Sequence, residues 1–377
     1  MGGGFLRGFD DRAATVSTTG RDGQPSLAVR RDYTSLIPLV RHRYEPDHAD
    51  VKALRARPRD VRITIDARFQ LAVASIVERA ARQSGSGKGA AVILDADTGE
   101  LLASVSYPFG NQDDVVLDRA RYGLYPPGST FKIITAAAAL REDAGLIDRT
   151  LTCQRLPNNR VGVSLPGHGP IHDDDRDRSA HGAIAMHEAI VKSCNAYFAQ
   201  LAVALGSDAL AHTAAAAGIT LNTSRSPERI LANLPHAGYG QGEVLVTPQR
   251  LARVAAAIGT DGIIHESPIV TSGTAVHTTF VTPGAARTLA GYLRDAVVDG
   301  TGRLLKAHPA RIAGKTGTAE VDDAPSHAWF VGFAPQGPAK RRIAFAVILE
   351  NAGYGGVAAA NAAGQIATAA MSMGLLK

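Results

Sequence analysis

Five short apolar runs, placed far apart along the chain, constrain the fold more than any other feature. Two lie near residue 100 and three lie after residue 310: 90–94, 100–107, 315–321, 328–333 and 343–350. Ala-rich segments with helical spacing separate and follow them, at 183–217, 246–258 and 358–373. Strands at both ends of the sequence, with helices between and after them, predict an α/β fold with one sheet assembled from distant segments.

Local signals support the first part of this order. Apolar residues recur at helical spacing from Ala67, and Ser84-Gly-Ser-Gly87 is expected to end that helix. The first two apolar runs are joined by Asp95-Ala-Asp-Thr-Gly99, whose Asp and Gly residues suit a tight turn. These two runs are therefore predicted to form a β-hairpin.

Composition excludes some functions. The chain has 377 residues and 45% hydrophobic content, enough to bury a substantial core. Its 40 basic and 35 acidic residues give a net charge of +5 with no long basic run, so nucleic-acid binding is not indicated. No apolar stretch reaches the roughly 18 to 20 residues of a membrane span. Residues 1–57 are polar and Arg-rich, and are predicted to be a linker or the remnant of a missing N-terminal domain.

Three short motifs carry the candidate chemistry. Ser129-Thr-Phe-Lys132 comes first, Ser193-Cys-Asn195 second and Lys315-Thr-Gly-Thr318 last. Each motif alone is short enough to arise by chance. Together and in this order they are typical of penicillin-binding proteins and class A β-lactamases.

The first motif offers a nucleophile and its base. A serine hydroxyl reacts poorly at neutral pH unless a base lies nearby and a site stabilises the oxyanion. The segment Tyr125-Pro-Pro-Gly-Ser129 predicts a loop that ends where a helix begins, so Ser129 is expected at a helix N-terminus. Lys132 lies one turn later on the same face. It can accept a proton only if its pKa is depressed, which burial and a second cation such as Lys315 would achieve.

The third motif is expected to form an edge strand beside the cleft. Alternation would send Lys315 and Gly317 to one face and Thr316 and Thr318 to the other. We expect the two threonines to offer hydroxyl groups to a substrate carboxylate, while strand twist lets Lys315 contribute as well. Gly317 would leave room for the backbone to approach the substrate closely.

Longer segments extend the likeness over roughly residues 58 to 373. They are AAVILDADTGELLASVSYP, LYPPGSTFKIITAAAAL, HGAIAMHEAIVKSCNAYFAQLA, GYGQGEVLVTPQRLA and GKTGTAEV followed by HAWFVGFAP. These segments resemble the transpeptidase domain of a class B penicillin-binding protein. The resemblance implies a five-stranded antiparallel sheet flanked by helices, with an inserted all-helical lobe. It also assigns residues 58–377 to the penicillin-binding transpeptidase domain.

The resemblance implies a serine-type D-Ala-D-Ala transpeptidase that cross-links peptidoglycan stem peptides through an acyl-enzyme on Ser129. β-Lactams would trap that serine covalently, and no cofactor would be required for catalysis. In this family the serine that matches Ser193 relays a proton to the leaving group, and the asparagine that matches Asn195 holds a substrate amide. The backbone N–H groups that match Ser129 and Thr318 form the oxyanion hole.

The resemblance also implies partners and a location. Stem peptides, β-lactam antibiotics and a membrane glycosyltransferase of the cell-wall machinery, serving cell shape or cell division, are the expected partners. The expected location is extracytoplasmic, on the periplasmic face of the inner membrane. Class B members usually carry a membrane anchor and a non-catalytic domain, and residues 1–57 are too few for both. We therefore expect a fragment of a longer protein, or a chain anchored through a partner.

Two other functions use the same three motifs. A β-lactam hydrolase needs a base that activates the deacylating water. Glu228 is the one carboxylate that we find at a suitable place, although the sequence around it is not typical. A β-lactam sensor domain would need a linked transmembrane transducer, which this chain does not contain. The transpeptidase is the preferred interpretation.

The two cysteines leave three alternatives open. Cys153 and Cys194 together with His181 and Asp175 would make a tetrahedral zinc set. Some elongation-type class B members carry a zinc site in this region, with similar spacings for all but Cys153. A disulfide would suit an extracytoplasmic compartment equally well. The third alternative is two free thiols beside a solvated acidic loop.

Overall fold

The computed structural model describes residues 14–19, 25–30, 36–57, 60–110, 117–221, 233–242 and 244–377. The chain divides into two units, Met1–Arg62 and Ile63–Lys377. The described part of the first unit contains an antiparallel strand pair and two short helices, β1 (Ala14–Thr19), β2 (Pro25–Arg30), α2 (Ile37–Arg41) and α3 (Ala49–Arg55).

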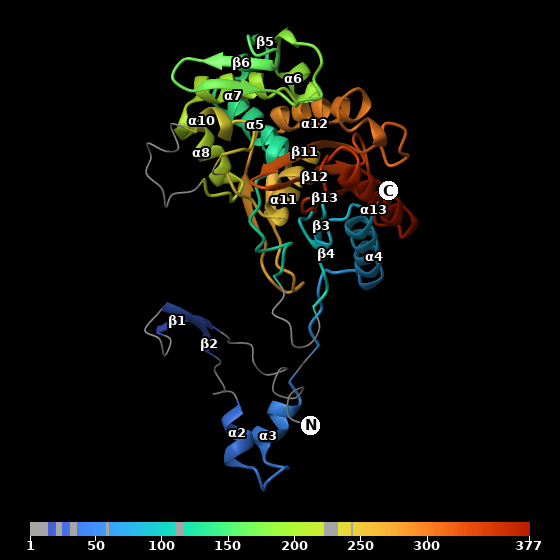
Figure 1. Cartoon of the computed structure of the whole chain (residues 1–377). Coiled ribbons are helices and arrows are strands. Elements are labelled where there is room, and N and C mark those ends of the chain that lie inside the picture. The colour runs from blue at the N-terminus through green and yellow to red at the C-terminus, as the bar shows by residue number, and fades with distance from the viewer. Residues whose placement is uncertain are drawn as a thin grey trace. The chain divides into compact units, whose positions relative to one another are not determined.

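The second unit is built on a five-stranded antiparallel sheet (Figure 1). Its strands lie in the order β11-β12-β13-β3-β4. They span β3 (Gly89–Asp95), β4 (Leu101–Tyr107), β11 (Ala313–Val321), β12 (Ala324–Ala334) and β13 (Ile343–Leu349). Residue 343 pairs with residue 95, so the late strands join the early hairpin directly. The predicted sheet and hairpin are confirmed.

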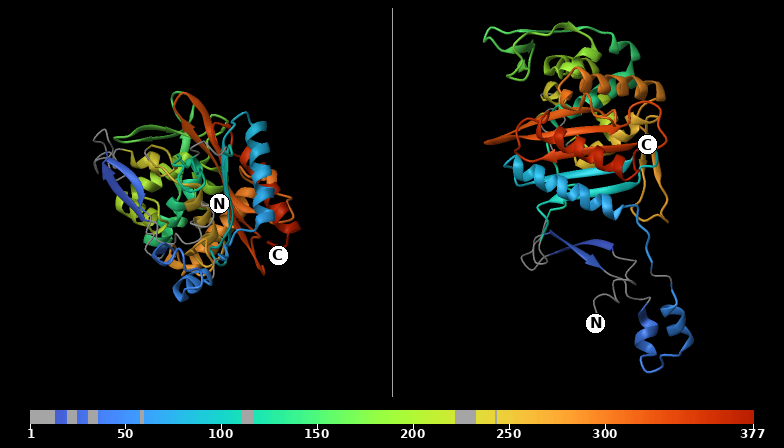
Figure 2. Two further views of the ribbon diagram at one scale, coloured as in Figure 1. Left: turned by 90° about the horizontal axis from the view of Figure 1, so that it is seen from below. Right: turned by 90° about the vertical axis from the view of Figure 1, so that its right-hand side faces the viewer.

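Helices cover both faces of this sheet. Helices α4 (Ala67–Gln83) and α13 (Ala358–Ser372) pack on one face, as Figure 2 shows, and α11 (Pro248–Gly259) packs on the other. Along β3, Val92 and Leu94 belong to the α11 side of the core, whereas Ile93 belongs to the α4 and α13 side. Strands β3 and β13 read as continuous apolar runs because their side chains point into one core or the other.

A lobe inserted between the early and late strands contains helices and a second sheet. Its elements are α5 (Lys132–Glu142), η3 (Ala144–Ile147), β5 (Leu151–Arg155), β6 (Val161–Leu165), β7 (Gly169–His172), β8 (Gly182–Ile184), α6 (Met186–Lys192), α7 (Asn195–Leu205), α8 (Ser207–Ala216) and α10 (Leu234–Ala237). The four strands form a sheet in the order β7-β6-β5-β8. The prediction of an all-helical lobe is therefore wrong. These strands are only three to five residues long, and β5 fully buries only Cys153, so no long apolar run marks them.

The short 3₁₀ turn η2 (Gly128–Phe131) leads into the lobe at α5. Between the lobe and the last strands lie α11, the hairpin β9 (Ile263–Glu266) and β10 (Val276–Thr279), helix α12 (Pro283–Val298) and the short 3₁₀ turn η4 (Arg303–Leu305). Helix α12 packs against β11. Within the described ranges, no helix combines the length and the apolar character that crossing a membrane requires.

Candidate active site

Ser129 lies in η2, the 3₁₀ turn that leads directly into α5. Two hydrogen bonds fix the loop before it: Trp329 Nε1 donates to the Pro126 carbonyl at 3.0 Å, and Gly128 N donates to the Gly240 carbonyl at 2.9 Å. Gly128 has a φ of +52°, and a Cβ there would lie 2.7 Å from the Thr318 carbonyl. A glycine is therefore needed for η2 to approach β11 so closely.

Lys132 lies beneath this serine and is completely buried. Its Nζ donates to Ser129 Oγ at 2.8 Å, to Asn195 Oδ1 at 2.6 Å and to the Ser193 carbonyl at 2.5 Å. Burial lowers the pKa of Lys132 to about 8, although the charge of Asp173 opposes the shift. The lysine is thus held at the nucleophile with a pKa near neutrality, and burial is the main cause.

Lys315 continues the chain of polar groups. Its Nζ donates to Ser193 Oγ at 2.8 Å, and Ser193 Oγ lies 3.2 Å from Lys132 Nζ. Ser193 sits at the C-cap of α6 with a left-handed φ of 61°, which turns the chain from α6 into α7. Burial, and then the positive charge of Lys132, lower the pKa of Lys315 well below its usual value. Ser193 therefore bridges two buried lysines.

Strand β11 presents its alternate residues as predicted, but Gly317 has a different role. A Cβ on Gly317 would lie 2.8 Å from Thr130 Cγ2 and 2.9 Å from the Pro127 carbonyl. Its missing side chain therefore makes room for η2, which corrects the expectation that this space serves the substrate. Thr316 and Thr318 line the cleft from the other face of the strand.

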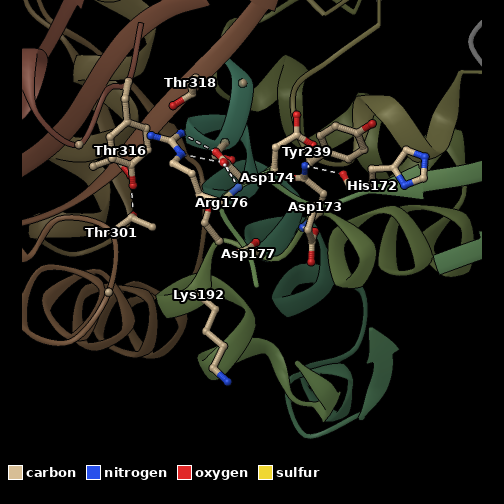
Figure 3. A pocket seen from close by; sticks show the side chains of 18 of the residues that line it. His172, Asp173, Asp174, Arg176, Asp177, Lys192, Tyr239, Thr301, Thr316 and Thr318 are labelled. Carbon is tan, nitrogen blue, oxygen red and sulfur yellow. Dashed lines mark hydrogen bonds and ion pairs between the residues drawn. The ribbon is translucent and has the colours of Figure 1, made fainter. Parts of the chain in front are cut away.

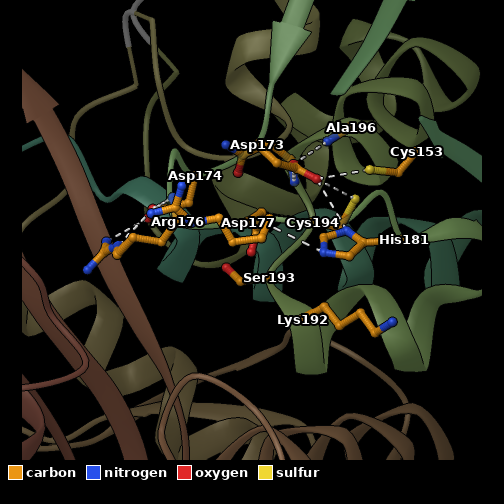
Figure 4. A network of polar contacts seen from close by, with 12 residues as sticks. Cys153, Asp173, Asp174, Arg176, Asp177, His181, Lys192, Ser193, Cys194 and Ala196 are labelled. Atoms are coloured by element: carbon orange, nitrogen blue, oxygen red, sulfur yellow. Dashed lines mark hydrogen bonds and ion pairs between the residues drawn. The ribbon is translucent and has the colours of Figure 1, made fainter. Parts of the chain in front are cut away.

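His172 and Asp173 hold the second motif in place through hydrogen bonds. Sequence reasoning did not identify either residue as part of the site. Asp173, only 4% exposed, accepts through Oδ1 from the backbone N–H groups of Asn195 and, at 3.0 Å, Ala196, as Figure 4 shows for Ala196. The His172 carbonyl accepts from Asn195 Nδ2 at 3.0 Å. These contacts aim Asn195 Oδ1 at Lys132. The run of three aspartates was visible in the sequence, but nothing there indicated which one points inward.

The other oxygen of Asp173 faces the two thiols. Oδ2 lies 3.1 Å from Cys153 Sγ, 3.2 Å from Cys194 Sγ and 3.3 Å from His181 Nδ1 (Figure 4). The structure therefore brings together three of the four predicted metal ligands, but with Asp173 in place of Asp175. Asp175 is instead exposed and pairs with Arg160 at 2.6 Å. It lies two residues beyond the inward-pointing Asp173, where the chain has already turned to the surface.

Charges within this cluster shift one another. A hydrogen bond with Asp173 raises the pKa of His181 to about 9. Burial raises the pKa of Asp173, but hydrogen bonds from His181 and Cys153 and the charge of Lys132 outweigh it and leave a value of about 2. A hydrogen bond from Cys194 lowers the pKa of the Cys153 thiol, whereas burial raises that of Cys194. Cys153 is thus the thiol that is favoured as the thiolate.

All three motifs open into one cleft with a volume of about 1400 Å³. Ser129, Ser193, Asn195, Thr316 and Thr318 line it, and Figure 3 shows Thr316 and Thr318 on the side opposite His172. Residues 173–178 form part of its wall. Glu228, the candidate base of a hydrolase, lies outside the described residues.

Comparison with known proteins agrees with this geometry. A family model described as the penicillin-binding protein transpeptidase domain matches residues 89–371. The peptidoglycan D,D-transpeptidase PbpA of Mycobacterium tuberculosis is 31% identical over 316 residues, which cover 71% of this chain and 62% of that protein. The peptidoglycan D,D-transpeptidase MrdA of Acinetobacter baumannii is 30% identical over 352 residues, which cover 74% of this chain and 50% of that protein. This chain thus matches between half and two thirds of the length of these relatives.

A solved structure shows the same fold over nearly the whole chain. The ceftriaxone acyl-enzyme complex of penicillin-binding protein A from M. tuberculosis superposes with a TM-score of 0.71 and 27% identity. The superposition covers 95% of this chain and 96% of that one. The chain belongs to the family of penicillin-binding protein transpeptidase domains.

Proposed function

We propose that this chain is a D,D-transpeptidase that cross-links peptidoglycan stem peptides through an acyl-enzyme on Ser129. The observation that carries the proposal is the 2.8 Å contact between Ser129 Oγ and the Nζ of Lys132, a buried lysine whose pKa burial lowers to about 8. Relatives named peptidoglycan D,D-transpeptidases, and a structural neighbour trapped as a β-lactam acyl-enzyme, support the same reaction.

Acylation starts with proton transfer from Ser129 Oγ to neutral Lys132 Nζ. The serine oxygen attacks the carbonyl carbon between the two terminal D-alanines, and a tetrahedral intermediate forms. When that intermediate collapses, the C–N bond breaks and the leaving D-alanine needs a proton on its nitrogen. Ser193 Oγ supplies it and is reprotonated by the lysines on either side, Lys132 at 3.2 Å and Lys315 at 2.8 Å.

The cleft contributes stabilisation and orientation. We assign the oxyanion hole to the backbone N–H groups of Ser129 and Thr318, because η2 packs directly against β11 at Gly128. Thr316 and Thr318 offer hydroxyl groups to the substrate from the cleft wall. Asn195, held on both sides by residues 172 and 173, orients Lys132 and offers its amide to the peptide.

Exchange of D-alanine tests the proposal. The wild type should replace the terminal D-alanine of a stem pentapeptide by a labelled D-amino acid, because an amine resolves the acyl-enzyme. Ser129→Ala and prior treatment with penicillin should both abolish the exchange. Labelled product formed by Ser129→Ala would refute the role of the serine. Release of D-alanine with water as the sole acceptor, lost in Glu228→Gln, would favour the alternative β-lactam hydrolase or a related hydrolase.

We propose further that Cys153, Asp173, His181 and Cys194 can hold a structural zinc ion. Their ligand atoms lie within 4.8 Å of one another, and ligand atoms around tetrahedral zinc are about 3.5 Å apart. His181 Nδ1 is buried and lies 3.3 Å from Asp173 Oδ2, so it faces the other ligand atoms of the cluster. When bound, the ion would tie the loop that carries Asp173 and His181 to α7, and catalysis itself requires no cofactor.

Metal analysis tests this part separately. Protein purified without chelator should contain about one equivalent of zinc, and removing the metal should lower the melting temperature. Cys153→Ser should lose the metal, while Asp175→Asn, the control on the same loop, should keep it. A metal-free protein whose two thiols titrate freely in the native state would exclude both zinc and a disulfide.

Location and partners follow from the reaction. Stem peptides are cross-linked outside the cytoplasm, so we propose an extracytoplasmic location for this domain, at the membrane where the glycan strands are polymerised. A membrane glycosyltransferase is the corresponding partner. Labelling of intact cells with a membrane-impermeant fluorescent β-lactam should mark the full-length protein at Ser129, and labelling only after lysis would contradict the location.

A further inference from the structure

Arg176 occupies a part of the cleft that the mechanism above does not use. It lies on the segment between β7 and β8 and lines the same cleft as Ser129, Thr316 and Thr318. Figure 3 shows its side chain extending from this segment towards the side of the pocket that carries Thr316. A guanidinium group is thus directed towards the third motif.

Two contacts hold this guanidinium group. Nε donates to Asp174 Oδ1 at 2.8 Å and Nη2 donates to Asp174 Oδ2 at 2.7 Å, a bidentate pair. On its other side, Cζ lies 3.5 Å from the ring centroid of Tyr354, a cation–π contact. The next residue, Gly355, donates its backbone N–H to Thr318 Oγ1 at 3.4 Å. The aromatic support of Arg176 is therefore attached to the strand that carries the third motif.

Asp174 holds Arg176 in a way that a substrate could replace. The side chains of Arg176 and Asp174 are 54% and 40% exposed and line the cleft, so an incoming group can reach both partners of the pair. A guanidinium group offers the same planar pair of donors to any carboxylate. An incoming carboxylate can thus take the place of Asp174 without loss of a charged hydrogen bond. The ring of Tyr354 would keep the guanidinium group in position during the exchange.

We propose that Arg176 is a specificity-determining residue that binds a carboxylate of the peptide donor, and that Asp174 occupies this position in the empty cleft. The identity of the donor as a peptide rests on the proposed function. A donor of this class carries a carboxylate at its C-terminus, and it can carry a second one on an acidic residue of the stem. Both offer the same chemistry to Arg176.

Opposite effects of two substitutions test the proposal. D-Alanyl thioester donors would be compared in three forms: with both carboxylates, with the terminal carboxylate as its amide, and with the internal carboxylate as its amide. Arg176→Gln should lower kcat/KM about tenfold or more for donors that contain the recognised carboxylate, because a charged hydrogen-bonded pair is lost. The same substitution should not change kcat/KM for the donor in which that carboxylate is replaced by its amide. The donor that is insensitive to Arg176→Gln thus identifies the carboxylate that Arg176 binds. Asp174→Asn should raise kcat/KM severalfold for the same donors, because the internal competitor is removed.

Controls separate this proposal from loop stability and from the proposed function. Asp175 lies on the same loop as Asp174 and Arg176 and pairs with Arg160. Asp175→Asn breaks that pair and should change neither the donor preference nor the rate. A fall in kcat/KM in both Asp174→Asn and Arg176→Gln, equal for all donors, would show that the pair only holds the loop and would overturn the proposal. Complete acylation of every variant by excess penicillin shows that the nucleophile works. Absence of acylation in the wild type would instead contradict the proposed function.

Discussion

Acylation of Ser129 should follow the titration of Lys132, because only the neutral amine can accept the serine proton. Burial lowers the pKa of Lys132 to about 8, so about 10% of the lysine is neutral at pH 7 and about 90% at pH 9. The second-order rate constant for acylation by penicillin should therefore rise about ninefold between these values. Below pH 7 it should fall about tenfold per unit.

The assay is stopped-flow or quenched acylation in a single buffer series of constant ionic strength, with protein mass as the readout. Lys132→Arg should be inactive throughout, because a guanidinium group does not lose its proton in this range. Lys192→Gln is the matched control: Lys192 precedes Ser193 in the chain but pairs with Glu188 at 2.8 Å, so its loss should leave the profile unchanged. A rate that stays flat from pH 6 to pH 9, or acylation of Lys132→Arg within threefold of the wild type, would refute the assignment of Lys132 as the base.

Three further substitutions test parts of the same structure. Relative to Lys132→Met, the wild type should gain about 3 kcal/mol of stability as the pH rises from 8 to 10.5, because the folded wild type loses its proton there before the unfolded chain does; a denaturation series over pH measures it, and a stability difference between the two proteins that does not change over this range would contradict it. Gly317→Ala should slow acylation more than tenfold, because its Cβ would push β11 away from η2. Adding Thr130→Ser should restore part of the rate, because it removes Thr130 Cγ2, the atom closest to that Cβ. Equal acylation rates in Gly317→Ala and the wild type would exclude this steric clash. Asp173→Ala should destabilise the fold by about 2 to 4 kcal/mol and slow acylation, since the N–H groups of Asn195 and Ala196 lose their acceptor, whereas Asp175→Ala should change stability by less than about 0.5 kcal/mol; equal losses of stability in the two variants would show that the hydrogen bonds to Asp173 are unimportant.

The large sheet was predictable because its strands leave a simple signature. Both of its faces are covered, so β3 and β13 are uninterrupted apolar runs, and the turn at 95–99 connects β3 to β4 directly. The meeting of Ser129, Ser193 and Lys315 was predictable from the order of the motifs rather than from any physical calculation. Only the family resemblance connected segments that lie so far apart in the sequence.

Other features depend on tertiary contacts that leave no pattern in the sequence. The lobe sheet escaped prediction because β5 to β8 are only three to five residues long, and β5, β7 and β8 each fully bury a single residue, so no long apolar run marks them. The choice between Asp173 and Asp175 depends on where the segment after β7 turns outward, and three adjacent aspartates give no local hint. The contact between Arg176 and Tyr354 joins the lobe to the segment after β13, and neither residue belongs to a motif.

The most direct test of the account is an intact-mass time course after exposure to penicillin. The wild type should gain the mass of one penicillin molecule and keep it for hours, and peptide mapping should place the adduct on Ser129. Ser129→Ala should show no adduct at any time, although its fold and melting temperature should be close to those of the wild type. An adduct on Ser129→Ala, or rapid loss of the wild-type adduct with turnover of free drug, would contradict the claim that Ser129 is the nucleophile of a transpeptidase.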